Sequence, residues 1–373
     1  MEASCWTREE NIIRRRRDVL IGASAAVATA VSLPSPSIAQ GRKEFSLATA
    51  WPAGSPGWWD SAVRLATTID TLSDGRLKIK VYPADQLVGA FETLDAVAAG
   101  VVDMYHAADN YFGAKVPALD IICSTPYGMT ADELSAWLLF GGGQALWDEA
   151  VAPHGIKSLA ACNTGDQMGG WFLKEVNEPA DFKGLRYRMP GLGAEVLRRM
   201  GATVVLVPGG DIITALKSGA IDASEWVGPW LDVALGLDKV ADYYYFPGFH
   251  EPATSATLGI NKKLWDGLTP SEQALIETAA AAEFTLSLAQ FNAENVRALK
   301  ALRADSRVKI TRFNDQLIKV FGKLSKEVIA DTAAKDPLTR KVVESYQTFL
   351  AGVMDWGELS ETGYRDTRRI ALS

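Results

Sequence analysis

Two stretches early in the chain alternate between apolar and polar residues, and a helical pattern lies between them. Residues 44–50 and 77–82 show the period of two that is typical of half-buried strands, whereas 58–72 carries apolar residues at helical spacing. A short helix over 93–99 and a short strand over 101–104 follow. Strands that alternate with helices in this way predict an α/β sheet with parallel pairs of strands.

A second run of the same kind begins near residue 157. It predicts three strands and two helices: strands over 158–161, 184–189 and 203–207, and helices over 193–200 and 211–218. Two α/β units in one chain, linked rather than repeated, imply two lobes with a cleft between them.

The last third of the sequence has a helical pattern. Residues 269–272 form a capping box with Pro at the first helical position, and the helix that starts there is predicted to run to about Ala304. Such a helix is roughly 34 residues, or roughly 50 Å, long. That length suits a strut across both lobes or a contact between two copies of the chain. Further amphipathic helices are predicted over 315–335 and 340–351.

The first 39 residues have the composition of an export signal. Four arginines at 14–17 precede an apolar run over 21–33, and small residues up to Ala39 mark a cleavage site. The arginines fit a twin-arginine signal, with general secretion as the alternative route. The apolar run is about 13 residues long, short of the roughly 20 that span a bilayer, which favours cleavage over an uncleaved membrane anchor. We therefore expect a periplasmic protein.

The formal net charge of −7 argues against a nucleic-acid partner. Proteins that bind nucleic acid need a basic surface, and the sequence has no basic run outside its first 20 residues. Two cysteines, Cys123 and Cys162, follow the signal. An oxidising compartment permits a disulfide between them, whereas their apolar neighbours favour buried free thiols.

Enzyme motifs are scarce. The three histidines show no metal-binding spacing, and the sequence has neither a nucleophile elbow nor a P-loop. The glycines at 191 and 193 match a dinucleotide fingerprint only in part, because the third position is Val196. The sequence therefore predicts a protein without catalysis. A secreted enzyme that uses Glu225 as a base is the alternative from another class.

Polar groups at predicted strand ends could hold a small anion. Arg188 ends a strand just before a Pro-Gly turn, where a guanidinium can grip a carboxylate with two parallel hydrogen bonds. Arg186 faces the same side of the strand, so spacing alone does not choose between the two. Glu225 follows another strand, and a buried carboxylate needs a partner. An arginine would serve, as would a hard ion such as Na⁺ or Ca²⁺ with the amide of Gln167 as a further ligand; the alternative is a half-exposed Glu225.

Three segments resemble a known family. Residues 164–172, 185–193 and 218–229 are similar to the extracytoplasmic solute receptors of TRAP transporters, the DctP family, and the similarity extends over 44–360. The Gln-Met-Gly-Gly-Trp-Phe and Glu-Trp-Val-Gly-Pro sequences inside these segments resemble the branch that binds 2-oxo monocarboxylates such as pyruvate, or 2-hydroxy acids such as lactate, with a metal ion.

The resemblance implies a two-lobed α/β periplasmic-binding-protein fold of type II-like architecture, with hinge strands and a long helix bridging the lobes. We expect the first lobe in 43–163 plus about 252–300, and the second in 164–251. Residues 301–373 are expected to form helices that pack across the lobes or in a dimer. The expected partners are a small organic acid, TRAP membrane subunits and a second copy of the chain.

The resemblance also implies roles for particular residues. Arg188 matches the carboxylate-gripping arginine, and Na⁺ or Ca²⁺ is the expected ion. The expected ligand contacts are Arg188, Gln167, Asn110, Tyr111, Trp226 and Phe172. The expected metal ligands are Gln167, Glu225, Trp226 through its backbone oxygen, and Glu251. At 247–252 the sequence departs from the family pattern, so either His250 or Glu251 completes the metal shell. A dicarboxylate, a sugar acid or a longer oxo acid is the alternative cargo on the same fold.

Overall fold

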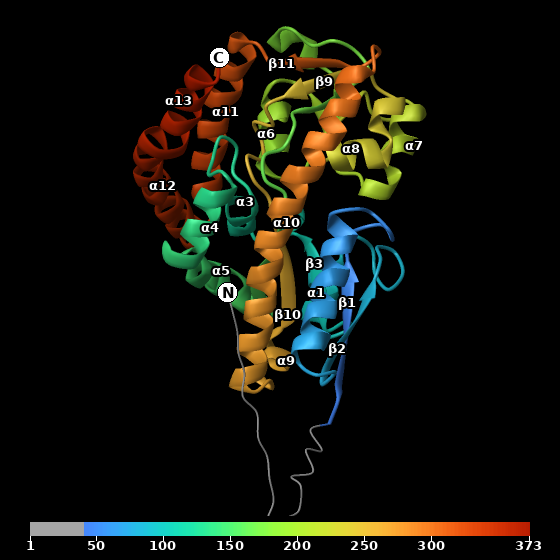
Figure 1. The fold of residues 1–373 in the computed structure, drawn as a ribbon, viewed down its shortest axis with the longest axis vertical. Helices are drawn as coiled ribbons and strands as arrows, with labels where there is room; N and C mark the ends of the chain where they lie inside the picture. Colours follow the sequence, from blue (N-terminus) through green and yellow to red (C-terminus); the bar gives the residue numbers. More distant parts are fainter. Residues whose placement is uncertain (1–40) are drawn as a thin grey trace, which may run out of the picture. The chain divides into compact units, whose positions relative to one another are not determined.

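The computed structural model describes residues 41–373, so the predicted export signal lies outside the described residues (Figure 1). Within this range no helix combines the length and apolarity that crossing a membrane requires. The described chain forms two sheets, each with helices packed against it, and this confirms the predicted two-lobed α/β fold.

The first sheet is built mainly from the first half of the chain. Its strands run in the order β2 (Leu77–Tyr82), β1 (Lys43–Thr49), β3 (Met104–Ala108), β10 (Ser255–Asn261) and β4 (Ile156–Asn163). The β1 strand pairs in parallel with β2 and β3, whereas β10 lies antiparallel between β3 and β4. Helix α1 (Trp58–Leu72) packs on β2, and both elements have the predicted bounds.

The strand predicted over 101–104 is displaced by three residues. Helix α2 (Thr93–Ala98) ends at Ala98, Gly100 follows with a positive φ, and the chain then turns through Val101, which is 69% exposed. The Asp103 carboxylate accepts hydrogen bonds from the backbone N–H and the hydroxyl of Ser46. These contacts fix the turn, so pairing with β1 starts only at Met104.

The second sheet combines strands from three parts of the chain. Its order is β11 (Lys309–Arg312), β9 (Tyr243–Phe246), β5 (Gly170–Phe172), β8 (Ala223–Ser224), β6 (Arg186–Arg188) and β7 (Thr203–Val205). Three helices lie between these strands in the sequence: α6 (Gly191–Arg199), α7 (Ile212–Lys217) and α8 (Pro229–Leu235). The strands predicted over 184–189 and 203–207 are present as the shorter β6 and β7, whereas β11 was missed because the C-terminal third reads as helical.

Helix α10 (Pro270–Ala304) packs against elements of both lobes. It contacts β4 and α1 on the first sheet and α8 on the second. The predicted capping box is present, with the Thr269 side chain accepting from the Glu272 N–H. The chain itself passes from β4 to β5 and returns from β9 to β10. The predicted long bridging helix is therefore confirmed.

The C-terminal helices also contact both lobes. Helix α11 (Asp315–Ala333) packs on α6, and α12 (Pro337–Gly357) packs on three helices of the first lobe. These are α3 (Ala118–Cys123), α4 (Ala131–Phe140) and α5 (Gly143–Val151), which the sequence analysis did not predict. A final helix, α13, covers Gly363–Ala371. Among the described residues, Cys123 and Cys162 are buried free thiols.

Candidate functional site

Strand ends and crossing segments of the two lobes meet at one buried cluster. Arg188 ends β6, and Glu225 directly follows β8, which is the parallel neighbour of β6. Gln167 lies on the crossing from β4 to β5, and the pair His250–Glu251 lies on the return from β9 to β10. Because the carboxyl ends of parallel strands meet at one sheet edge, the topology brings these residues together.

Arg188 is buried, and its guanidinium is only partly engaged. Its Nη1 donates to the Glu225 carboxylate at 2.8 Å and to the Glu225 carbonyl at 2.9 Å, and its Nε donates to the Val207 carbonyl at 3.1 Å. Its Nη2 is buried and has no hydrogen-bond partner within residues 41–373. The Trp226 ring lies 5.4 Å from the guanidinium carbon. One edge of the guanidinium thus remains available to an anion.

The neighbouring arginine has a different environment. Arg186 is exposed and forms a two-point pair with Asp222, with N···O distances of 2.8 and 2.5 Å. The structure thus brings Arg188 into the cluster and leaves Arg186 on the surface.

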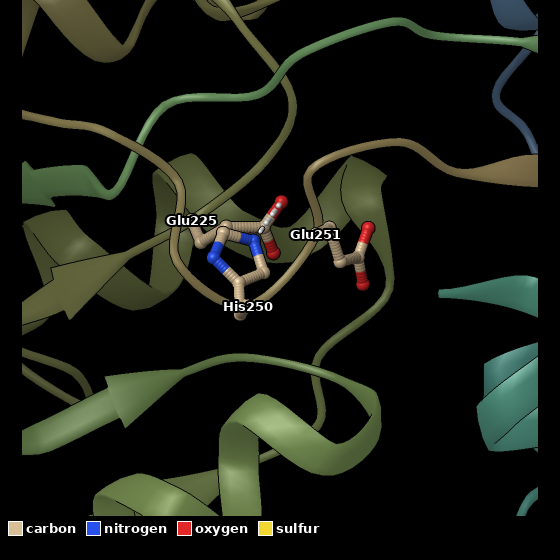
Figure 2. Close-up of side chains that lie close together, drawn as sticks. All are labelled: Glu225, His250 and Glu251. Carbon is tan, nitrogen blue, oxygen red and sulfur yellow. Dashed lines mark ion pairs between the residues drawn. The ribbon is translucent and has the colours of Figure 1, made fainter. Parts of the chain in front are cut away.

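Glu225 and His250 lie side by side (Figure 2). The Nε2 atom of His250 is 3.6 Å from Oε1 of Glu225, and both side chains are almost fully buried. Burial raises the pKa of Glu225 to about 7, although the Arg188 charge opposes this shift. Burial also lowers the pKa of His250 to about 4, so the imidazole is neutral near pH 7. The site therefore contains an acid that burial disfavours in its charged form.

Glu251 adds a second buried carboxylate. One oxygen accepts from Asn110 Nδ2 at 2.7 Å, and the other accepts from Gln167 Nε2 at 2.9 Å and from the Thr254 hydroxyl. Burial and the Glu225 charge raise the pKa of Glu251. Two adjacent buried carboxylates lie near one guanidinium, and having both charged is unfavourable unless one takes up a proton or a cation joins them.

The donor set fits a hard cation. Ligand atoms of Glu225, His250 and Glu251 all lie within 4.8 Å of one another. The amide nitrogen of Gln167 faces Glu251, Thr254 and Thr164, so its oxygen is left buried and without a partner within residues 41–373. Carboxylate and amide oxygens are the ligands that Na⁺ and Ca²⁺ prefer. Both His250 and Glu251 reach the cluster, and oxygen chemistry favours Glu251 as the ligand.

Asp232, at the start of α8, anchors the segment that carries Glu225 and Trp226. One of its oxygens accepts from the Val227 N–H at 3.0 Å. The other accepts from Trp171 Nε1 at 3.0 Å and from the Tyr244 hydroxyl at 2.7 Å. The Val227 carbonyl in turn accepts from the Met168 N–H. The two segments that carry the oxygen ligands are therefore held together through Val227, a role that the sequence analysis missed.

Aromatic side chains wall the cluster on the side of the first lobe. Asn110 and Tyr111 lie in a short 3₁₀ turn after β3, and Asn110 contacts the cluster through Glu251. The rings of Tyr111 and Trp226 lie 6.2 and 6.5 Å from that of Trp51, which is fully buried. Trp51 Nε1 donates to His106 Nδ1 at 2.8 Å. Trp51 was not among the expected ligand contacts.

Phe172 does not join this cluster. Its ring packs edge-on against Phe182, Tyr187 and Tyr245 in the core of the second lobe. Strand alternation explains this position, because Phe172 and Tyr187 share one face of the sheet while Arg188 lies on the other. The expectation of a ligand contact from Phe172 is therefore corrected. The same alternation turns Tyr244 away from Tyr245, so Tyr244 stacks on Trp171 whereas Tyr245 stacks on Phe313.

Comparison with known proteins identifies the same branch of sequences. The family model for bacterial extracellular solute-binding proteins, family 7 (DctP), matches residues 47–336. A monocarboxylate 2-oxoacid-binding periplasmic protein of Nostoc sp. is 35% identical over 359 residues, which are 94% of this chain and 98% of that protein.

Solved structures are similar over the same range. A TRAP transporter solute-binding protein of Bordetella bronchiseptica, a mixed-occupancy dimer with copurified calcium and picolinate, has a TM-score of 0.86 at 32% identity and covers 89% of this chain and 98% of its own. A TRAP periplasmic solute-binding protein of Pseudoalteromonas atlantica with bound sodium and pyruvate has a TM-score of 0.84 at 36% identity and covers 87% and 99%.

Proposed function

This chain belongs to family 7 of the bacterial extracellular solute-binding proteins, and we propose that it captures a small 2-oxo or 2-hydroxy monocarboxylate, of the pyruvate type, together with Na⁺ or Ca²⁺. The observation that carries this proposal is the Arg188 guanidinium, whose Nη2 has no partner within residues 41–373 and whose Nη1 binds the Glu225 carboxylate that clusters with Glu251. A cargo with a carboxylate and a neighbouring donor oxygen would bind both the guanidinium and a cation held by the carboxylates.

In the proposed complex, Arg188 binds the cargo carboxylate through its free Nη2 atom. Glu225, Gln167, Glu251 and the Trp226 carbonyl would hold the cation, which supplies the charge that lets two carboxylates and an anionic cargo share one buried site. Trp51, Trp226 and Tyr111 would enclose the alkyl end. Because both lobes supply contacts, cargo binding would favour the closed arrangement of the lobes.

The cargo class follows from the charges of the cluster. In the part of the chain that the structure describes, Arg188 is the one cationic side chain whose charge lowers the pKa of both Glu225 and Glu251. A second cargo carboxylate would lack a partner, which favours a monocarboxylate over a dicarboxylate.

The ligands of the relatives share this chemistry. Pyruvate carries a carboxylate next to a carbonyl oxygen, and picolinate carries one next to a ring nitrogen. Both ligands can therefore chelate a cation through an atom beside the carboxylate. A secreted enzyme that uses Glu225 as a base is not proposed, because the family is one of binding proteins.

The protein is further proposed to act outside the cytoplasm, after export through the signal at 1–39, and to deliver cargo to TRAP membrane subunits. We also propose a homodimer, supported by exposed apolar residues at the C-terminus and by the dimer of the Bordetella relative. These apolar residues are Met354, Trp356, Leu359, Tyr364, Ile370 and Leu372.

A thermal-shift screen on metal-stripped protein tests the cargo assignment. We expect 2-oxo or 2-hydroxy monocarboxylates to raise the unfolding midpoint when Na⁺ or Ca²⁺ is added back, since a ligand at 100 times its Kd stabilises the fold by about 2.7 kcal/mol. Dicarboxylates and sugar acids serve as controls. If only dicarboxylates or sugar acids raise the unfolding midpoint, the assignment of a monocarboxylate cargo is wrong.

A further inference from the structure

The 3₁₀ turn after β3 (Asp109–Phe112) carries two residues that the first lobe presents to the cluster. Asn110 donates from Nδ2 to Glu251 at 2.7 Å, and the Tyr111 ring lies 6.2 Å from that of Trp51. The other donors to Glu251 come from the two crossing segments. The position of this turn therefore determines how the first lobe contacts the cluster.

Asp109 attaches the start of the turn to the body of the first lobe. Its carboxylate is fully buried. One oxygen accepts from the Tyr105 hydroxyl at 2.9 Å, and the other accepts from Trp147 Nε1 at 3.1 Å. Tyr105 belongs to β3 and Trp147 to α5, so two elements hold one carboxylate. A buried carboxylate is costly unless its oxygens accept hydrogen bonds, and both oxygens do so here.

Tyr105 is itself fixed, and it contacts the turn at both ends. A Cβ added at Gly259 in β10 would lie 1.9 Å from Tyr105 Cε1, so the ring lies directly on the Gly259 backbone. The same ring packs edge-on against Phe112, with 5.6 Å between the ring centroids. Tyr105 therefore contacts both Asp109 and Phe112, the first and last residues of the turn.

Building on the proposed function, we infer that Asp109 is a positioning residue for cargo capture. Its carboxylate fixes the turn, and the turn holds Asn110 within hydrogen-bonding reach of Glu251. This contact joins the first lobe to the segment that returns from β9 to β10, which favours the closed arrangement of the lobes. Asp109 thus acts on cargo affinity through Asn110 and contacts neither the cargo nor the ion.

Calorimetry with pyruvate, in the presence of Na⁺ or Ca²⁺, compares two matched Asp→Asn variants. Asp109→Asn replaces one of two acceptor oxygens with an amide nitrogen, so pyruvate affinity should fall by about 10-fold. Asp103→Asn makes the same change before the other end of β3, where the carboxylate binds Ser46, and should alter affinity by less than about 2-fold. If Asp109→Asn does not fold, Tyr105→Phe removes one of the two donors and should lower affinity as well.

A double-mutant cycle separates positioning from a general loss of stability. If Asp109 acts through Asn110, the variant that combines Asp109→Asn with Asn110→Ala should bind pyruvate within about 3-fold of Asn110→Ala alone. Losses of affinity that multiply in the double variant would show that Asp109 acts by another route, and the inference would be wrong.

Hydrogen exchange on cargo-free protein measures the turn directly. The backbone amides of 109–112 should exchange faster in Asp109→Asn than in wild type, and at the wild-type rate in Asp103→Asn. Wild-type exchange or wild-type pyruvate affinity in Asp109→Asn would overturn the inference while leaving pyruvate capture intact. If the wild-type protein binds pyruvate with neither ion, the proposed function fails instead, and the exchange rates still report whether Asp109 fixes the turn.

Discussion

At the scale of single residues, Arg188 and Arg186 differ in what surrounds them rather than in their spacing. Both side chains leave the same face of β6, but Arg186 lies at the exposed start of the strand and pairs with Asp222. Arg188 lies between the Glu225 carbonyl and the Trp226 ring, and its buried Nη2 has no partner among residues 41–373. A planar guanidinium in that position binds Val207 through Nε and Glu225 through Nη1 and still presents Nη2 to a cargo carboxylate, a division of donors that a lysine cannot reproduce.

Matched Arg→Lys substitutions test this difference. Arg188→Lys keeps the charge but loses the planar fork, so pyruvate affinity measured by calorimetry should fall by about 10- to 100-fold. Arg186→Lys alters an exposed ion pair and should change affinity by less than about 2-fold. Equal losses in the two variants would remove Arg188 from the cargo site.

The sequence could nominate candidate residues but could not place them all. Arg188, Glu225 and Gln167 follow predicted strand ends, and the structure does bring them together. Glu251 joins the cluster because the segment from β9 back to β10 passes beside Gln167. No local sequence pattern indicates where that segment passes. Phe172 was misplaced because its face of β5 depends on the register with β8.

At the scale of elements, local signals predicted some segments well and tertiary contacts decided others. Helices α1 and α10 have strong apolar periodicity or a capping box, and their bounds match the predictions. Strand β11 pairs with β9, more than 60 positions earlier in the sequence, and no local pattern specifies that partner. The start of β3 depends likewise on the contact between Asp103 and Ser46.

The Asp232 anchor gives a prediction at this scale. Asp232→Asn leaves one acceptor oxygen where two oxygens now serve three donors, so the free energy of unfolding in urea should fall by about 1 to 3 kcal/mol. Pyruvate affinity should fall as well, since the Val227 peptide next to Trp226 loses its fixed position. Asp242→Asn, at an exposed position before β9, serves as the control. Wild-type affinity and stability in Asp232→Asn would show that the anchor is dispensable.

At the scale of the whole molecule, the C-terminal helices expose large apolar side chains to solvent. Residues 351–373 include α13 and the end of α12, and none of them is buried. Trp356 is 66% and Leu359 is 81% exposed. Several exposed apolar side chains on one C-terminal segment are typical of an interface, because covering them removes apolar surface from water. A second copy of the chain is the proposed partner, consistent with the dimer of the Bordetella relative.

Light scattering on paired variants tests that proposal. We expect the wild-type protein to have the mass of a dimer and Leu359→Glu to shift it toward the monomer, because each interface would have to bury two new charges. Val101→Glu changes an exposed apolar residue of the first lobe and should leave the dimer intact. Pyruvate affinity should stay the same in both variants, since neither residue belongs to the cluster around Arg188. A wild-type protein with monomer mass, or a Leu359→Glu protein that remains dimeric, would contradict the assigned interface. A loss of pyruvate binding together with the dimer would instead mean that the C-terminal helices hold the lobes in their binding arrangement.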